Sequence, residues 1–110
     1  MFQAGGNIEQ RDRFGHPPLT FAIKRRSPEH LAIVEYLVNR RGAKVNTESM
    51  YGYTPLIIAA WHGNTSAVAM LLEEGADAFA KDSTDMTSLH WAASHEHPEI
   101  VKLLLKDRFV

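Results

Sequence analysis

The chain has 110 residues, of which 45% are hydrophobic, and this length fits one globular unit rather than several domains. It contains no cysteine, which excludes disulfides and thiolate zinc sites and fits a reducing compartment. The sequence shows no N-terminal apolar signal region and no apolar run near about 18 residues, so neither secretion nor membrane insertion is indicated. We therefore expect a cytoplasmic protein, with the nucleus as the alternative location.

The net charge of −1 conceals an uneven distribution along the chain. Residues 11–44 carry eight Lys and Arg residues against three Asp and Glu residues, a net charge of +5. Residues 45–79 carry four acidic residues and no Lys or Arg, a net charge of −4. Such asymmetry can orient a charged partner. It also fits ordinary scatter of charge on a solvated surface, and the sequence leaves both interpretations open.

The first residues of the chain align with a segment that occurs later. Residues 5–7 (Gly-Gly-Asn) align with residues 75–77 (Gly-Ala-Asp), and Asp12 aligns with Asp82. In this register the first two residues, Met and Phe, stand where a helix makes its last turn. We therefore predict that residues 1–11 are the end of a preceding repeat and lead into an extended finger.

Residues 12–48 are predicted to form a first repeat of two helices. The Pro17-Pro18 pair opens the first helix, because the missing amide N–H of proline costs nothing in a first helical turn. Ser27 and Pro28 are typical of the N-cap and first position of a second helix. Compared with the later repeats, this second helix should be longer by nearly one turn.

Residues 49–81 form the most regular unit. Pro55 opens a short helix, which the Gly63-Asn64 pair ends. An apolar stripe at helical spacing then predicts a second helix that stops at Gly75, since glycine readily takes the left-handed conformation found after a helix. The segments that follow each second helix suit short hairpins better than helices.

Residues 82–110 keep the same pattern but change its turns. Asp85 replaces a turn glycine, which is tolerable because aspartate adopts left-handed conformations more readily than most residues. Ser88 replaces the proline that opens the first helix, and Pro98 opens the last helix. The unit ends without a Gly-Ala-Asp stop, so we predict a truncated third repeat.

Three leucines mark the repeat, because Leu19, Leu56 and Leu89 are 37 and 33 residues apart. Together with the Thr-Pro-Leu sequence at 54–56, this pattern resembles the ankyrin repeat, whose signature includes T-P-L-H-x-A at a period of 33. The resemblance implies an all-α fold in a single domain over residues 1–110. This fold is an ankyrin-type α-solenoid of helix-turn-helix repeats with short β-hairpin fingers. The predicted core comprises Leu19, Ala22, Val34, Leu37, Leu56, Ala59, Val68, Leu71, Leu89, Ala92, Val101 and Leu104.

One cluster of residues, His90, His95 and His97 with Glu96 and Glu99, invites a metal-binding interpretation. It does not contain the His-Glu-x-x-His spacing that places two ligands on one helical face. Short His-rich tracts are only compositional evidence. The family resemblance instead gives the first of these histidines a structural role, in hydrogen bonds within and between turns. We expect no metal site and no cofactor.

Catalytic chemistry and nucleic-acid binding are also not indicated. The chain has no Cys nucleophile, no Gly-x-Ser-x-Gly elbow and no glycine-rich phosphate loop. The cations at 24–26 and 40–41 stand on a nearly neutral chain without a recognition-helix motif, which favours a solvated face. We predict that the chain is not an enzyme, has no catalytic residue and has no small-molecule substrate.

The ankyrin resemblance also implies a binding surface on the concave face, made of finger tips and the exposed side of the first helices. Carried onto this sequence, those positions are Arg13, Phe14, His16, Lys24, Arg25, Met50, Tyr51, Tyr53, Trp61, His62, Met86 and His95, with Ser83, Thr84 and Ser94 beside them. Tyr, Trp and Arg dominate interface hot spots, and exposed aromatic patches mark interaction sites. The alternative is that Trp61 and Tyr51 pack across neighbouring fingers.

The function predicted from these positions is non-catalytic protein–protein recognition. The aromatic residues would anchor an acidic or aromatic-containing segment of another protein, and Arg13, Lys24 and Arg25 would attract its acidic portion. The alternative is a regulatory or targeting ankyrin segment of a larger enzyme, channel or scaffold protein, which the cut register at both ends favours. A purely structural spacer is a third option, and an enzyme in its own right is the least favoured.

Overall fold

The computed structural model describes residues 7–108, with side chains described as far as residue 106. The prediction that Met1 and Phe2 end a preceding helix lies outside these residues. The described helices are α1 (Pro18–Ile23), α2 (Pro28–Glu35), the π-helical turn η1 (Tyr36–Arg40), α3 (Pro55–Trp61), α4 (Thr65–Glu73), α5 (Ser88–Ser94) and α6 (Pro98–Arg108). None of them is long and apolar enough to cross a membrane.

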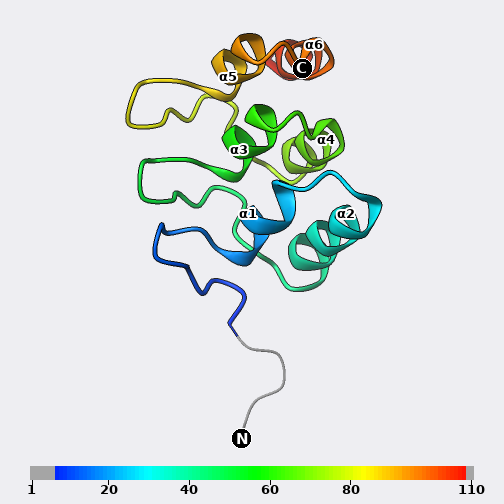
Figure 1. The fold of residues 1–110 in the computed structure, drawn as a ribbon. Coiled ribbons are helices and arrows are strands. Elements are labelled where there is room, and N and C mark those ends of the chain that lie inside the picture. Colours follow the sequence, from blue (N-terminus) through cyan, green and yellow to red (C-terminus); the bar gives the residue numbers. More distant parts are fainter. Residues whose placement is uncertain (1–6, 109–110) are drawn as a thin grey trace, which may run out of the picture.

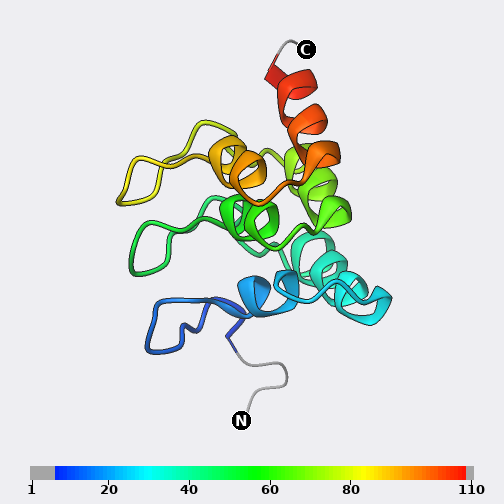
Figure 2. The same cartoon turned by 45° about the horizontal axis from the view of Figure 1, so that its top comes forward.

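The helices stack in two layers, which confirms the predicted α-solenoid (Figure 1). Helices α1, α3 and α5 pack successively in one layer, and α2, α4 and α6 pack successively in the other. The loops before α1, α3 and α5 project to the same side as three fingers, and the turned view shows them side by side (Figure 2). No strand occurs within residues 7–108, so the predicted hairpin fingers are loops closed by turns rather than paired strands.

Side-chain caps begin most of these helices where the sequence predicts them. The Thr54 hydroxyl accepts a hydrogen bond from the Ile57 N–H (3.2 Å) at the start of α3. At α5, the Thr87 hydroxyl accepts from the His90 N–H while His90 Nδ1 accepts from the Thr87 N–H, which makes a reciprocal capping box. The His90 side chain therefore has a structural role as part of the α5 cap.

The second helix of the first repeat is continuous but changes its winding. Eight α-helical residues of α2 run into five π-helical residues of η1, against nine residues in α4. The Arg41 N–H donates to the Tyr36 carbonyl (3.2 Å), five residues back. The residues predicted to lengthen this helix therefore fall in a helical run with a wider last turn. The repeat boundaries drawn from the sequence stay predictions.

The core lies between the two helix layers. Nine of the twelve residues predicted for it are buried, among them Leu19, Val34 and Leu71, each no more than 1% exposed. Leu37, Leu89 and Val101 are half-buried and pack against this core. Leu37 lies in the π-helical turn, and the other two lie in the last described helix pair.

Polar side chains tie each repeat to the next. Asn64 caps α4 and also donates to the carbonyls of Ile23 (2.9 Å) and Arg25 (3.3 Å) at the end of α1. In the next repeat, His97 Nε2 lies 3.2 Å from the Trp61 carbonyl oxygen. Buried carbonyls at the ends of the first helices thus find partners in the following repeat.

A second set of ties connects the bases of the fingers. The Glu9 carboxylate accepts from the Lys44 N–H (2.9 Å). Asn46 accepts from the Asp77 N–H (2.7 Å) and donates to the Gly75 carbonyl (3.1 Å). The two acceptors, Glu9 and Asn46, therefore hold equivalent places in successive repeats, which fixes the fingers relative to one another.

Candidate functional site

A carboxylate closes the tip of the first and third fingers. Asp12 Oδ1 accepts from the N–H groups of Phe14 and His16, both at 2.9 Å. Asp82 Oδ1 accepts from Thr84 (2.9 Å) and Met86 (3.0 Å) in the same way. The alignment of Asp12 with Asp82 in the sequence is therefore reflected in identical turn geometry.

The pKa of each of these carboxyls is lowered. For Asp12 the hydrogen bond from the His16 N–H is the main cause. For Asp82 burial acts to raise the pKa, but hydrogen bonds from Thr84, Met86 and Trp91 lower it further than burial raises it. Hydrogen bonds to the ionised form hold both groups as carboxylates at neutral pH.

The middle finger has no carboxylate at this position, because Ser49 stands there. The Ser49 N–H donates to the Tyr53 carbonyl (2.9 Å), as the Asp12 N–H does to the His16 carbonyl in the first finger (3.0 Å). The Ser49 hydroxyl is buried without a hydrogen-bond partner among the described residues. The finger that carries Met50 and Tyr51 thus has no carboxylate to close its turn.

Left-handed backbone at the tips explains the residue types found there. Gly52 has a φ of 79° and Asp85 a φ of 65° at equivalent places in their fingers. A Cβ at Gly52 would also lie 3.2 Å from the Asp82 Cα of the neighbouring finger. The predicted left-handed role of Asp85 is confirmed, and glycine is needed where the fingers approach most closely.

Large apolar side chains are exposed along the finger tips. Phe14, Met50 and Tyr51 are 51%, 56% and 57% exposed, and we call them the fingertip strip. The Met50 N–H donates to the Phe14 carbonyl (3.0 Å), and the Ser83 N–H donates to the Tyr51 carbonyl (2.9 Å). The strip therefore crosses from finger to finger on a hydrogen-bonded support.

Behind the strip, Tyr53, Trp61 and Trp91 form an aromatic stack. The two indole rings are parallel, 4.7 Å apart with an interplanar angle of 18°, and Tyr53 lies 5.8 Å and 6.4 Å from them. All three residues are half-buried, and the Trp91 indole donates to Asp82 Oδ2 (2.9 Å). Trp61 thus packs across repeats, as the alternative interpretation of the sequence required.

Tyr51 packs within its own finger and stays largely exposed. Its ring meets that of Tyr53 edge to face at 6.5 Å, while 57% of its surface stays exposed. Trp91 is the member of this surface that the sequence did not predict. It stands at the place of Phe21 in α1 and Ile58 in α3, where an apolar residue looks like scaffold. Its contact with the Trp61 ring depends on the stacking of two repeats.

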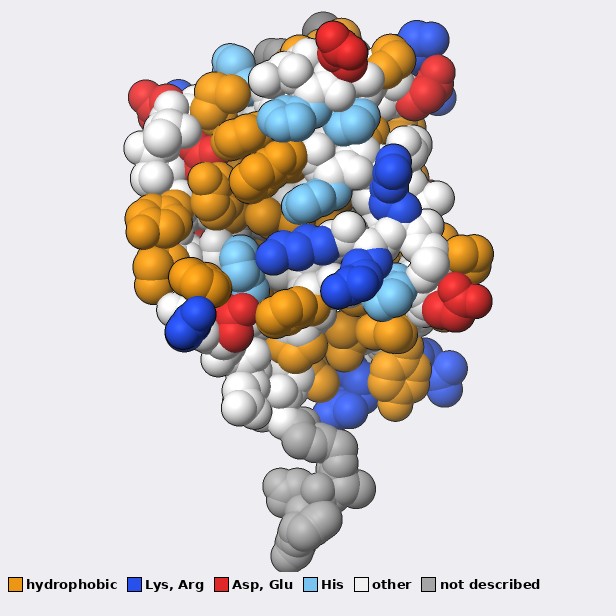
Figure 3. Space-filling view, in the orientation of Figure 1, with side chains coloured by type: hydrophobic (Ala, Val, Ile, Leu, Met, Phe, Trp, Pro, Cys, Tyr) orange, Lys and Arg blue, Asp and Glu red, His pale blue; other side chains and the backbone are white. Residues whose placement is uncertain are grey.

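Basic side chains and histidines continue the same face toward the helices. Figure 3 shows Lys, Arg and His side chains grouped beside an apolar patch. The Lys24 ammonium lies 5.5 Å from the centre of the Phe21 ring, and the Arg13 guanidinium lies 5.2 Å from that of Phe14. These cations therefore border the exposed aromatic side chains.

The positive charge of this region affects its histidines. Burial and then the Lys24 charge lower the pKa of His16, while Asp12 acts to raise it. Burial, followed by the charges of Lys24, His95 and Arg26, lowers the pKa of His62. Both imidazoles are consequently neutral at pH 7.

The structure places most of the predicted contact residues on this one face. Tyr53, Trp61, His62 and His95 are joined by ring contacts. Met86 differs, because it is half-buried in the third finger with its N–H bound to Asp82. Their contact with a partner stays a prediction.

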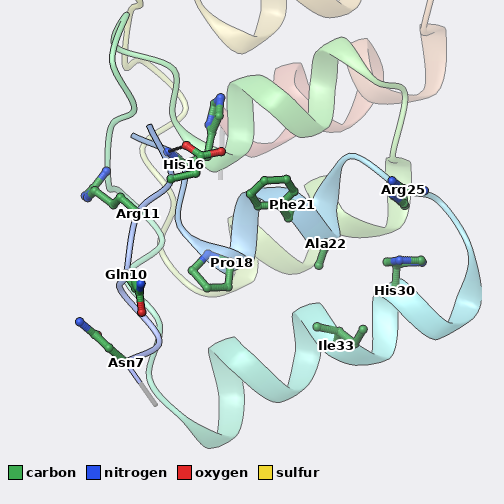
Figure 4. Close-up of a pocket in the computed structure, with 11 residues that line it drawn as sticks. Asn7, Gln10, Arg11, His16, Pro18, Phe21, Ala22, Arg25, His30 and Ile33 are labelled. Carbon is green, nitrogen blue, oxygen red and sulfur yellow. Dashed lines mark hydrogen bonds between the residues drawn. The ribbon is translucent and has the colours of Figure 1, made fainter. Parts of the chain in front are cut away.

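A groove of about 590 Å³ adjoins this face at the end of the array where the chain enters it. It lies between the segment 7–12 and helices α1 and α2 (Figure 4). Phe21 and Ile33 give it apolar walls, and Arg25 and His30 give it basic ones. Within the described residues, no three His, Asp or Glu side chains are placed to hold a metal ion.

The comparison with known proteins agrees with this architecture. The family model for ankyrin repeats, in three copies, matches residues 1–82 and 52–109. The ankyrin repeat protein nuc-2 of Neurospora crassa is 36% identical over 90 residues, which are 81% of this chain and 8% of that protein. The neurogenic locus notch homolog protein 2 of Homo sapiens is 31% identical over 107 residues, 97% of this chain and 4% of that protein.

Inversin of Canis lupus familiaris is 34% identical over 98 residues, 89% of this chain and 9% of that protein. The chain therefore spans less than a tenth of the length of these relatives. The matched family model, the two stacked helix layers and the Asp-closed fingers agree with one another. The chain belongs to the ankyrin repeat family.

Proposed function

We propose that this chain recognises another protein through the face formed by its fingers and first helices. Ankyrin repeats are generally non-catalytic protein-interaction modules. The observation that carries the proposal is the fingertip strip, in which three large apolar side chains are each more than half exposed. Exposed apolar groups that are ordered and contiguous favour a partner contact.

The roles within this face differ from those expected of the aromatic residues as a group. Trp61 and Tyr53 are half-buried in the aromatic stack, so they support the surface rather than anchor a partner by themselves. Tyr51 and Met50 are the anchors that we propose, because their side chains are exposed on a finger fixed by its neighbours. The cations beside them would attract acidic portions of the partner.

Affinity capture followed by mass spectrometry tests this proposal. The fingertip variant Met50→Ser/Tyr51→Ser is compared with the parent chain and with a control variant, Tyr36→Ser/Leu105→Ser. The control removes apolar side chains that are 53% and 39% exposed but belong to η1 and α6. We expect the control to retain the proteins captured by the parent and the fingertip variant to lose them.

Urea melts of all three proteins establish that the variants are folded. Equal capture of the same proteins by the parent and a folded fingertip variant would contradict the proposal. Capture that is lost only in the control would move the binding surface to the second helices.

A second candidate is a regulatory or targeting ankyrin segment of a larger enzyme, channel or scaffold protein. The relatives support it, because each is more than ten times as long as the segment it shares with this chain. The sequence of the full-length transcript tests it. A reading frame that continues into a catalytic or channel domain would favour this candidate, and one limited to these repeats would exclude it.

A further inference from the structure

Three basic side chains occupy the same place in successive repeats. Arg25, His62 and His95 each lie six residues after the framework leucine of their repeat, where the first helix ends. We call them the basic row. Arg25 and His95 are exposed, and His62 is half-buried. Because the first helices stack in one layer, the basic row follows this layer along the array, whose fingers project to one side (Figure 1).

The aromatic stack fixes the two imidazoles of the row. The His62 ring is parallel to the Trp61 ring, 5.4 Å away with an interplanar angle of 19°. The His95 ring lies 6.1 Å from Trp61 and 5.6 Å from Trp91. Both rings thus rest on a half-buried support, which reduces the entropy lost when a ligand orders them.

The charges that face the row are mainly positive. Lys24 and Arg26 act on His62 from the α1 side, and His95 acts on it from the α5 side. His95 itself faces His62 and the His97 ring, 6.4 Å away, and Glu96 follows it in the chain. Among the described residues, no member of the row forms an ion pair. The side chains of the row are therefore free to pair with negative charges on a partner.

The spacing of the row restricts what can pair with it. Stacked helices lie about 8–10 Å apart. A peptide in the extended polyproline II conformation advances about 3.1 Å per residue with three residues per turn, so every third side chain returns to the same side after about 9 Å. A helical peptide rises about 1.5 Å per residue and returns side chains to one side over about this distance only at every seventh residue.

We propose that the basic row binds an extended acidic segment of a partner protein, with carboxylates at every third residue, and that this binding strengthens as the pH falls below 7. The inference rests on the proposed function, since it assigns a partner chemistry to the same face. Arg25 provides one permanent positive charge, and the His62 imidazole adds a second when it takes up a proton. The affinity of this face for an acidic segment thus rises as the pH falls.

The sign of the effect follows from the groups involved. Burial and the surrounding cations lower the pKa of His62, so this imidazole is neutral at pH 7. A carboxylate bound beside it raises that pKa, and complex formation therefore takes up protons. Glutamate side chains stay ionised down to about pH 5, so the partner keeps its charge while the row gains its own.

Isothermal titration with synthetic peptides tests the proposal. The probe contains three Glu-Ser-Thr units, and its control has the same composition with the three glutamates adjacent. We expect the probe to bind about two- to fivefold more tightly near pH 6 than near pH 7.5, as one further charge pair at His62 predicts. Titration in buffers of different ionisation enthalpy should show proton uptake near pH 6.

Matched variants assign the effect to the row. His62→Gln/His95→Gln should remove the pH dependence, and Arg25→Gln should weaken binding at both pH values. His90→Gln is the control, because a glutamine at this position can still complete the α5 capping box and the side chain is not part of the row. His95→Gln alone, at an exposed position, provides a second test if the double variant does not fold.

The proposal is overturned if neither peptide binds, if both bind equally, or if the pH dependence survives in a folded His62→Gln/His95→Gln protein. The fingertip experiment separates this result from failure of the proposed function. If the fingertip variant loses capture and any of these outcomes is found, the proposed partner recognition is supported but the basic row takes no part in it.

Discussion

At the scale of single residues, the three fingers share one type of turn, but the side chain that can accept its backbone hydrogen bonds differs. A carboxylate at the base of the turn accepts two backbone N–H groups in the first and third fingers. Ser49 cannot do so in the second, and its buried hydroxyl has no partner among the described residues. The middle finger carries Met50 and Tyr51, so the turn without a carboxylate presents two of the three side chains of the fingertip strip.

Replacing Ser49 by aspartate should therefore stabilise the chain. The new carboxylate would accept the N–H groups of Tyr51 and Tyr53, and charge-assisted hydrogen bonds of this kind contribute about 1–2 kcal/mol to the free energy of unfolding. Urea melts at pH 7 measure the change. Ser49→Ala is the matched control, since it removes the unpaired hydroxyl without adding an acceptor. Equal stability of the two variants would show that the carboxylate makes no such bonds.

Because of the Asp82 carboxylate in the third finger, the free energy of unfolding should fall in acid. Because the pKa of Asp82 is below its ordinary value of 3.8, the unfolded chain binds this proton more readily than the folded one. The contribution of Asp82 is therefore complete above about pH 4 and disappears as the pH falls through the lower, folded value. The urea midpoint measured between about pH 5 and pH 2 should fall more for the parent than for Asp82→Asn. Parallel curves would contradict this assignment.

At the scale of the elements, side chains that cap a helix also connect repeats. Asn64 satisfies the Ala67 N–H of its own helix and two carbonyls at the end of α1. His97 reaches the Trp61 carbonyl from the equivalent place in the third repeat. The aromatic stack and the basic row depend on these ties, because they hold the first helices in register.

The two roles of Asn64 can be separated by substitution. Asn64→Ser keeps a cap for α4 but cannot reach α1, whereas Asn64→Ala loses both. We expect Asn64→Ser to cost about 1–3 kcal/mol through the unpaired carbonyls, and Asn64→Ala to cost about 1 kcal/mol more. Chemical denaturation gives both values. If Asn64→Ser were as stable as the parent, the bonds to Ile23 and Arg25 would make no net contribution.

At the scale of the whole molecule, the described helices of each repeat pack against those of the neighbouring repeats, so stability is shared between them. The middle repeat packs on both sides, through α3 against α1 and α5 and through α4 against α2 and α6. Its buried residues thus hold the entire array together. A defect there should weaken the fingertip strip and the basic row at once.

Leu71→Ala tests this dependence. The side chain is fully buried, and its truncation should lower the free energy of unfolding by about 2–5 kcal/mol, a large part of the stability of a small domain. Tryptophan fluorescence and far-UV circular dichroism should then report the same shifted urea transition. Leu105→Ala, at a position 39% exposed on α6, should cost less. An unshifted melt of Leu71→Ala would mean that the predicted core register is wrong.

Much of this architecture follows from the sequence, because it is local. The Pro and Ser/Thr/Asn positions that begin helices, the glycines that end them and the apolar stripes act within a few residues of the chain. The aligned residues Asp12 and Asp82 make the same turn in the first and third fingers. These signals also gave the solenoid and most of its core, since each repeat must bury the same positions against its neighbours.

Only the tertiary structure decides which side chains of the proposed binding face are exposed and which pack against one another. The sequence grouped Tyr51, Tyr53 and Trp61 as one set of anchors and did not include Trp91. Stacking of the second and third repeats buries Trp61 against Trp91 and leaves Tyr51 exposed. Exposure and ring contacts depend on how residues about 30 positions apart pack together, and a local sequence pattern does not show this.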